Sequence, residues 1–219
     1  FSLGEDMWQS MLVDLQKAEK FIYLEYFIIE QGEFWDCILE ILKEKAENGL
    51  DVRVVFDDVG CMNTLPGNYA KQLKGFGIKA TPFSRLKGQA DNEFNNRSHR
   101  KIMVIDGKIG YTGGVNIADE YINKIEKFGH WKDVGVRLEG EAVYELTKLF
   151  LIDYGINLKE MPDNLPTDVL FPSTNITEKG FLVPFGDGPA PIYKRRVAQS
   201  LIVDMLSNAK KYAYIMTPY

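Results

Sequence analysis

The sequence has few cysteines and no excess of positive charge. Its two cysteines, Cys37 and Cys61, are too few for a disulfide framework and lack the paired spacing of a zinc site. The formal net charge of -5 and the pI near 5.2 disfavour broad nucleic-acid binding, although they leave room for a local basic cleft. We therefore expect no bound metal and no nucleic-acid partner.

Long apolar runs are also missing. The longest, residues 21–29, is far below the roughly 20 residues that a spanning helix needs, and Glu25 interrupts it. The chain begins at Phe1 without a methionine and stops at Tyr219 directly after an apolar run. We therefore expect a soluble piece of a longer protein.

What the sequence does contain is enough apolar residues, 45% of the 219, for a conventional core. Helical spacing of apolar residues alternates with short runs rich in β-branched and aromatic residues. The expected helices are 7–18, 34–48, 69–73 and 141–154, and the expected strands are 21–29, 51–56, 78–83, 101–105, 108–112 and 133–138. This rhythm predicts an α/β fold, a mixed β-sheet with helices on both faces.

Two further features organise the chain. Asp106-Gly107 between two strand-like runs predicts a hairpin with a two-residue turn. Residues 158–177, rich in Pro, Asn, Asp and Thr, predict a connecting loop and the domain border.

The sequence also repeats itself. Residues 9–14 (QSMLVD) reappear as 199–204 (QSLIVD), and residues 18–24 (AEKFIYL) as 209–215 (AKKYAYI). Two amphipathic helices that lead into strands could look alike by chance, but a duplication explains the shared polar positions better. We expect residues 1–180 to be a first half and 181–219 the truncated beginning of a second, each starting with a helix and a strand.

Both histidines, His99 and His130, lie in one polar segment. Because side chains two apart on a strand share a face, His99 and Lys101 are predicted to project together while Arg100 points the other way. Asp106 has the opposite parity and lies in the predicted turn, which favours a role in fixing the hairpin.

A histidine beside a lysine suits attack on a phosphodiester. The neutral imidazole is a nucleophile near pH 7, and the ammonium neutralises the non-bridging oxygens as the phosphorus becomes pentacovalent. The alternative is an edge strand whose basic side chains are simply solvated.

The spacing His99-x-Lys101-x-x-x-x-Asp106, followed by Gly113-Gly114-x-Asn116, resembles the phospholipase D superfamily signature at all positions but Gly114, where many superfamily nucleases carry serine. Several segments are similar to the bacterial cardiolipin synthases in particular, which commonly have that glycine. These are residues 24–27, 56–60, 97–101, 104–107, 111–117, 119–121, 131–133 and 216–219.

The resemblance implies roles for particular residues. His99 and Lys101 match the catalytic pair, and Asp106 completes the signature and is counted with them as catalytic. Asn116 matches a phosphate-contacting residue, and Asp133 the acid that hydrogen-bonds the histidine. For Asp133 the alternative is an ion pair with Lys132 or Arg137. His130 is expected to be a surface residue, and Asp57 and Asp58 to cap a loop without binding metal.

The resemblance further implies a phosphatidyltransferase that makes cardiolipin and glycerol from two phosphatidylglycerol molecules without a cofactor. His99 acts as nucleophile, forming a phosphatidyl-histidine, or as acid. The family requires a second His-x-Lys from the other half, so the piece alone is expected to be inactive. The whole protein is expected at the bacterial cell membrane, anchored by segments outside this chain. A phosphodiesterase or nuclease of the superfamily, and a non-catalytic scaffold, are the alternatives.

Overall fold

The computed structural model describes residues 1–84, 97–158, 181–188 and 195–215. Two compact units, Phe1–Pro184 and Phe185–Tyr219, make up the chain, and each is described by itself. Most of the predicted connecting loop, from residue 159 on, lies outside the described residues, and the division into two homologous halves stays a prediction. Among the described residues, no helix has both the length and the apolar character needed to span a bilayer.

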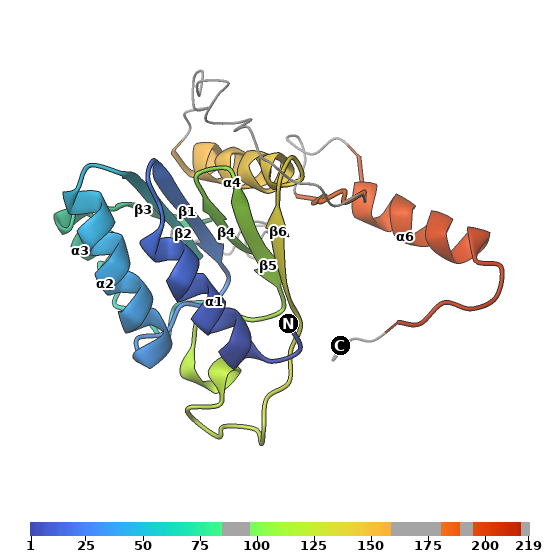
Figure 1. Cartoon of the computed structure of the whole chain (residues 1–219), viewed down its shortest axis with the longest axis horizontal. Coiled ribbons are helices and arrows are strands. Elements are labelled where there is room, and N and C mark those ends of the chain that lie inside the picture. The colour runs from blue at the N-terminus through green and yellow to red at the C-terminus, as the bar shows by residue number, and fades with distance from the viewer. Residues whose placement is uncertain (85–96, 159–180, 189–194, 216–219) are drawn as a thin grey trace, which may run out of the picture. The chain divides into compact units, whose positions relative to one another are not determined.

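The first unit is built on a six-stranded sheet with the order β3-β2-β1-β4-β5-β6 (Figure 1). The strands β1, β2 and β3 are parallel, whereas β4, β5 and β6 join antiparallel. Their bounds are Phe21–Tyr26 (β1), Asp51–Asp57 (β2), Lys79–Phe83 (β3), Lys101–Ile105 (β4), Ile109–Gly113 (β5) and Gly135–Glu139 (β6). The prediction of a mixed sheet is confirmed.

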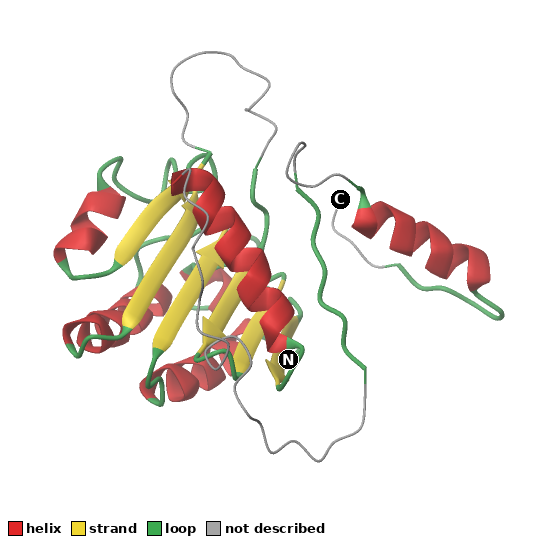
Figure 2. Cartoon of the chain, turned by 90° about the horizontal axis from the view of Figure 1, so that it is seen from above, coloured by secondary structure: helices red, strands yellow, loops and turns green. Residues whose placement is uncertain are grey.

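Helices cover both faces of this sheet (Figure 2). On one face, α1 (Gly4–Gln16), α2 (Glu33–Glu47) and α3 (Tyr69–Gly75) pack on inward side chains of the central strands, among them Leu24 and Met103. On the other, α4 (Val143–Leu158) packs on Tyr23 and Val104. Each central strand alternates between two apolar layers, as expected when both faces are buried.

The hairpin between β4 and β5 is confirmed, but its connection is one residue longer than predicted. Asp106 and Gly107 have φ values of 53° and 67°, the left-handed pair that favours Asp-Gly at the centre of a tight turn, and Lys108 N donates to Ile105 O. The ladder, however, pairs Ile105 with Ile109, so three residues connect the strands.

In the second unit, the predicted helix is present as α6 (Val197–Asn208). The strand expected over residues 209–215 is not formed there. A strand exists only with a neighbour that takes up its backbone hydrogen bonds, and the described residues of this unit supply none. None of the side chains of α6 is buried, so the described residues of this unit form no core of their own.

Candidate active site

The signature residues other than Asp106 gather at one edge of the sheet. The ladder places the start of β4 beside the ends of β1 and β2, since Tyr26 pairs with both Lys101 and Phe56. It also places the end of β5 beside the start of β6, through Gly113 and Gly135. Residues that follow β1, β2 and β5 therefore meet those that precede β4 and β6.

His99 and Lys101 project to one side, where both contact the ring of Phe27. The His99 and Phe27 ring centroids are 4.8 Å apart, and Lys101 Nζ lies 5.3 Å from the Phe27 centroid. Lys101 Nζ also donates to the backbone oxygen of His99 at 2.8 Å. Arg100 reaches the opposite face, where it pairs with Asp153 of α4. The predicted alternation of side chains is confirmed.

The two groups differ in exposure, and this shapes their protonation. Lys101 is only 4% exposed, and burial lowers its pKa from 10.5 to about 8, although the charges of Asp133 and Asp57 act in the opposite direction. His99 is exposed on its outer side, yet burial of its inner side and the positive charge of Lys101 hold its pKa below 6.5. At pH 7 the site thus presents a neutral imidazole beside an ammonium group.

Asp57, at the end of β2, holds the backbone before His99 in place. Its carboxylate is fully buried and accepts from Ser98 N at 3.0 Å, and it lies 3.4 Å from Arg97 Nη1. It also accepts from Val59 N and Gly60 N, so it caps its own loop as predicted. One carboxylate thereby ties the loop after β2 to the segment that carries His99.

Asn116 is buried, 3% exposed, and its amide joins two segments. Its Oδ1 accepts from Ile28 N at 3.1 Å and its Nδ2 donates to Tyr121 Oη at 2.8 Å. These bonds hold the segment after β1, which includes Phe27, against the segment after β5. The amide therefore helps to hold the frame of the site, and its contact with a substrate phosphate stays a prediction.

Asp133 lies at the same edge, against Gly114. Its oxygens accept from Trp131 Nε1 at 3.2 Å and from Val134 N at 2.7 Å, while Arg137 pairs with Asp14 and Glu139. A Cβ on Gly114 would lie 2.0 Å from Asp133 Oδ1. The glycine where many superfamily members have serine thus leaves room for this carboxylate.

A methyl group at position 114 is therefore a specific probe of Asp133. We expect Gly114→Ala to displace the carboxylate, which removes a charge that raises the Lys101 pKa. In the full-length protein, the alkaline limb of the pH profile of kcat/KM should therefore move to lower pH, and turnover at pH 8 should fall a few-fold. Gly75→Ala, with no atom within 4 Å of its Cβ, is the matched control. An unchanged pH profile in Gly114→Ala would refute this coupling.

The structure does not bring Asp106 to this edge. Asp106 follows β4 at its far end, and its carboxylate accepts from the backbone N–H groups of Glu19, Lys20 and Phe21 at 2.8–2.9 Å. It is 5% exposed and anchors the start of β1 to the hairpin. These bonds favour the role in fixing the hairpin that its parity indicated over the catalytic role that its place in the signature implied.

Replacing Asp106 should accordingly affect stability and not chemistry. We expect Asp106→Ala to lower the free energy of unfolding by about 2–4 kcal/mol, because three N–H groups lose a charged acceptor. Asp106→Asn, which keeps one acceptor oxygen and tolerates positive φ, should lose less. Urea unfolding measures both. A large loss of turnover in a variant that remains folded would contradict this assignment.

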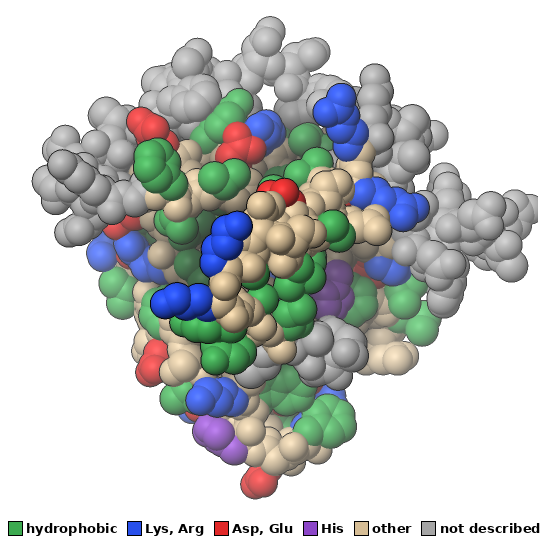
Figure 3. Space-filling view, turned by 90° about the vertical axis from the view of Figure 1, so that its right-hand side faces the viewer, with side chains coloured by type: hydrophobic (Ala, Val, Ile, Leu, Met, Phe, Trp, Pro, Cys, Tyr) green, Lys and Arg blue, Asp and Glu red, His purple; other side chains and the backbone are tan. Residues whose placement is uncertain are grey.

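His130 is exposed, as predicted, in the loop before β6. Both histidines of the chain (purple) are visible on one face of the molecule in Figure 3. Within the described residues, no group of three or more His, Cys, Asp or Glu side chains is placed to hold a metal ion.

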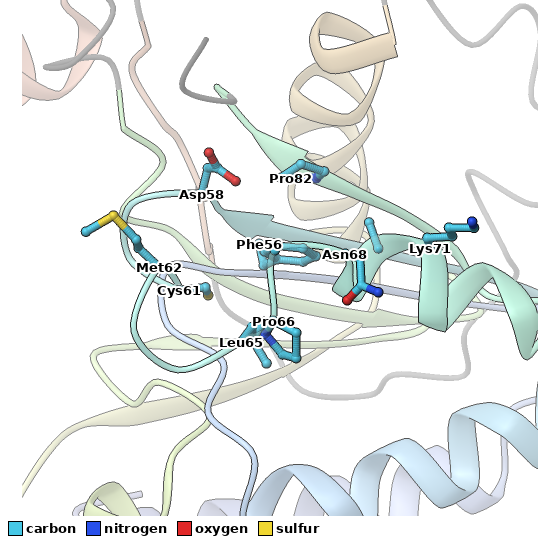
Figure 4. A pocket seen from close by; sticks show the side chains of 11 residues that line it. Phe56, Asp58, Cys61, Met62, Leu65, Pro66, Asn68, Lys71 and Pro82 are labelled. Carbon is cyan, nitrogen blue, oxygen red and sulfur yellow. The ribbon is translucent and has the colours of Figure 1, made fainter. Parts of the chain in front are cut away.

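A cavity of about 560 Å³ adjoins this edge, between the loop after β2, α3 and the end of β3 (Figure 4). Most of its lining is apolar, with Asp58, Asn68 and Lys71 as the polar side chains; the others are Phe56, Cys61, Met62, Leu65, Pro66, Gly67, Ala70 and Pro82. The loop that lines it packs on Phe27, since Cys61 Sγ donates to Phe27 O. This loop thus lies next to the residue whose ring contacts His99 and Lys101.

The sequence patterns did not indicate a place in the site for Phe27, or for the buried acids Glu25 and Asp153 on the α4 side of the sheet. The available signal was Glu25, a lone carboxylate within an apolar strand.

Solved structures that share this fold include a phospholipase D family member and a phosphatidylserine synthase. Nuc from Salmonella typhimurium has a TM-score of 0.51 at 17% identity and covers 67% of this chain and 86% of its own. Phosphatidylserine synthase from Haemophilus influenzae has a TM-score of 0.57 at 18% identity, covering 78% of this chain and 40% of its own. At such low identity the likeness shows the fold alone.

The family follows from closer sequence relatives. The family model described as "Cardiolipin synthase, PLD-like domain" matches residues 11–133. A cardiolipin synthase from Geobacillus kaustophilus is 36% identical over 99% of the chain and 42% of its own length, and one from Staphylococcus aureus 33% over 99% and 43%. An uncharacterized protein from Streptococcus mutans is 42% identical over the whole chain and 47% of its own length. The chain belongs to the phospholipase-D-like domain family of cardiolipin synthases, and it spans less than half the length of these relatives.

Proposed function

We propose that the protein containing this chain is a phosphatidyltransferase that joins two phosphatidylglycerol molecules into cardiolipin and glycerol. The observation that carries the proposal is the pairing of a neutral imidazole, His99, with a buried ammonium group, Lys101, on one side of the sheet edge. The family and its cardiolipin synthases support a lipid phosphodiester as the substrate.

The chemistry is a two-step displacement at phosphorus. One imidazole attacks the phosphodiester and forms a phosphatidyl-histidine, while a second imidazole donates a proton to the departing glycerol oxygen. That second group then takes the proton from a hydroxyl of the next phosphatidylglycerol, whose oxygen displaces the histidine. His99 fills one of these two roles, and the bond energy held in the intermediate makes an external energy source unnecessary.

Lys101 stabilises the pentacovalent transition state. Its ammonium group is shielded from water, and this strengthens its attraction to the negative charge that develops on the non-bridging oxygens. The hydrogen bond from Lys101 Nζ to the backbone oxygen of His99 holds the ammonium group in a fixed position beside the residue that carries the imidazole.

The chain supplies half of such a site. With His130 exposed in a loop, His99 is the one imidazole at this edge, and the two-step displacement needs another. A second His-x-Lys from the downstream half of the protein, or from a second copy in a two-fold arrangement, would complete it. The isolated chain is therefore expected to turn over little or no lipid.

Water competes with the second lipid for the intermediate, so the site must exclude it. The largely apolar cavity beside Phe27 suits the hydrocarbon part of a lipid, and its volume lies in the range of small-molecule sites. We assign it to the substrate's lipid portion.

The discriminating experiment supplies the full-length protein with phosphatidylglycerol vesicles and, separately, with single-stranded DNA. Formation of cardiolipin together with glycerol supports the proposal. Release of phosphatidic acid alone would indicate hydrolysis, and DNA cleavage without lipid turnover would indicate a nuclease. Unchanged lipid turnover in a His99→Ala variant would indicate that this half is a scaffold.

A further inference from the structure

A carboxyl group is buried directly behind the His99 segment. Glu25 lies on the central strand β1 and is 0% exposed, on the face covered by α4. Its Oε2 accepts no hydrogen bond from any N–H or O–H donor in the described part of the chain. An ionised carboxylate with such an oxygen would carry a large desolvation cost.

The residues on either side of His99 both reach this group. Ser98 Oγ donates to Glu25 Oε1, and Arg100 Nη1 lies 4.0 Å from the same oxygen. Arg100 also forms an ion pair with Asp153 of α4. With Ser98 and Arg100 held on the α4 face, the intervening His99 is directed to the opposite face, toward Phe27.

The cluster has two carboxyl groups and one guanidinium group. If both carboxyls were ionised, two negative charges would lie beside the same Arg100 nitrogen, and Glu25 Oε2 would accept no hydrogen bond from the described residues. Burial and the negative charge of Asp153 raise the pKa of Glu25 well above its usual range. One proton removes the repulsion between the two carboxylates and gives Glu25 an O–H donor for Asp153.

We propose that Glu25 and Asp153 share one proton, and that the resulting singly charged pair, bound to Arg100 and Ser98, fixes the direction of the His99 side chain. Glu25 and Asp153 are then positioning residues, acting on the site through the backbone on both sides of the imidazole. The catalytic importance of that direction rests on the proposed function, whereas the shared proton does not.

If Glu25 and Asp153 together carry a single negative charge, substitutions at the two positions should change kcat in a specific pattern. In Glu25→Gln the amide replaces a neutral carboxyl group, so Asp153 still balances Arg100. In Asp153→Asn, Glu25 ionises and balances Arg100 itself. Each single variant should keep kcat of the full-length protein within about three-fold, because one counter-charge remains in each.

The double variant Glu25→Gln/Asp153→Asn takes both carboxylates of this pair away from Arg100. We expect kcat to fall about 100-fold with KM little changed, which is the effect of misplacing a reacting group by about 1 Å. Glu145→Gln/Lys148→Met, which removes an exposed ion pair from α4, is the matched control and should have no effect. Additive small losses, or a collapse of activity in Glu25→Gln alone, would overturn the proposal.

Two substrate-free measurements on the chain separate this proposal from the proposed function. Infrared spectra at pH 7 should contain a protonated-carboxyl C=O band that disappears in either single variant and persists in Glu145→Gln. Imidazole NMR signals of His99, assigned with His130→Gln, should stay sharp in the single variants and broaden in the double variant. Absence of the band in the unaltered chain refutes the shared proton, whatever the lipid assay gives.

Discussion

Replacing His99 by Gln is expected to lower lipid phosphodiester turnover of the full-length protein by at least about 10³-fold. Glutamine retains hydrogen-bonding atoms at the position but neither forms a bond to phosphorus nor carries a proton between oxygens. The side chain is exposed on its outer side, so the variant should fold normally. Steady-state formation of cardiolipin and circular dichroism measure the two properties.

The control for this variant is His130→Gln. It removes the chain's other histidine, which is exposed in the loop before β6, and should leave turnover unchanged. Activity above about a tenth of the unaltered level in His99→Gln would exclude both roles proposed for this imidazole, since either role is worth at least about 10²-fold.

Replacing Lys101 by Met should change activity and stability in opposite directions. Turnover should fall by about 10²–10³-fold, the usual loss when a preorganised charge is removed from a transition state. Stability should rise by up to about 3 kcal/mol, because the folded state no longer holds a desolvated cation. Lys17→Met, at an exposed lysine of α1's C-terminal cap, is the matched control and should change neither property much.

The pH dependence gives the sign of this stability effect. Because the Lys101 pKa falls from 10.5 in the unfolded chain to about 8 in the folded one, the unfolded state binds more protons between these values. The folded state thus gains stability as the pH rises through this window, and the advantage of Lys101→Met should shrink accordingly. Urea unfolding at pH 7 and pH 10 tests this. In activity, the same group should give kcat/KM an alkaline limb near pH 8 in the unaltered protein. A difference in the free energy of unfolding between Lys101→Met and the unaltered protein that is the same at pH 7 and pH 10 would contradict the low pKa assigned to Lys101.

Local sequence patterns predicted the architecture of the first unit well. Alternating helical and strand periodicities placed each strand of the sheet within a few residues, and the strand parity of residues 99–102 correctly separated His99 and Lys101 from Arg100. These properties depend on neighbours in sequence, which is why periodicity detects them.

The surroundings of the site depend on contacts between distant segments, and there the patterns were insufficient. Nothing local indicates that Phe27 lies against His99, or that Glu25 meets Asp153 on a helix more than a hundred residues later. The motif spacing grouped Asp106 with His99, yet a strand of five residues separates them and carries Asp106 to the far edge of the sheet.

The second unit illustrates a different limit. Its helix depends on local propensity and formed as predicted, whereas a strand over residues 209–215 depends on pairing with another strand. The second copy that the repeat indicates therefore stays a prediction.

The most direct test of the account is a titration of the chain with dihexanoyl phosphatidylglycerol, a soluble lipid phosphodiester, followed by NMR of the imidazole and lysine side chains. We predict that the His99 and Lys101 signals shift together with one binding constant while those of His130 do not move. Signals of His99 and Lys101 that stay constant, or that respond with different binding constants, would contradict a shared phosphate site.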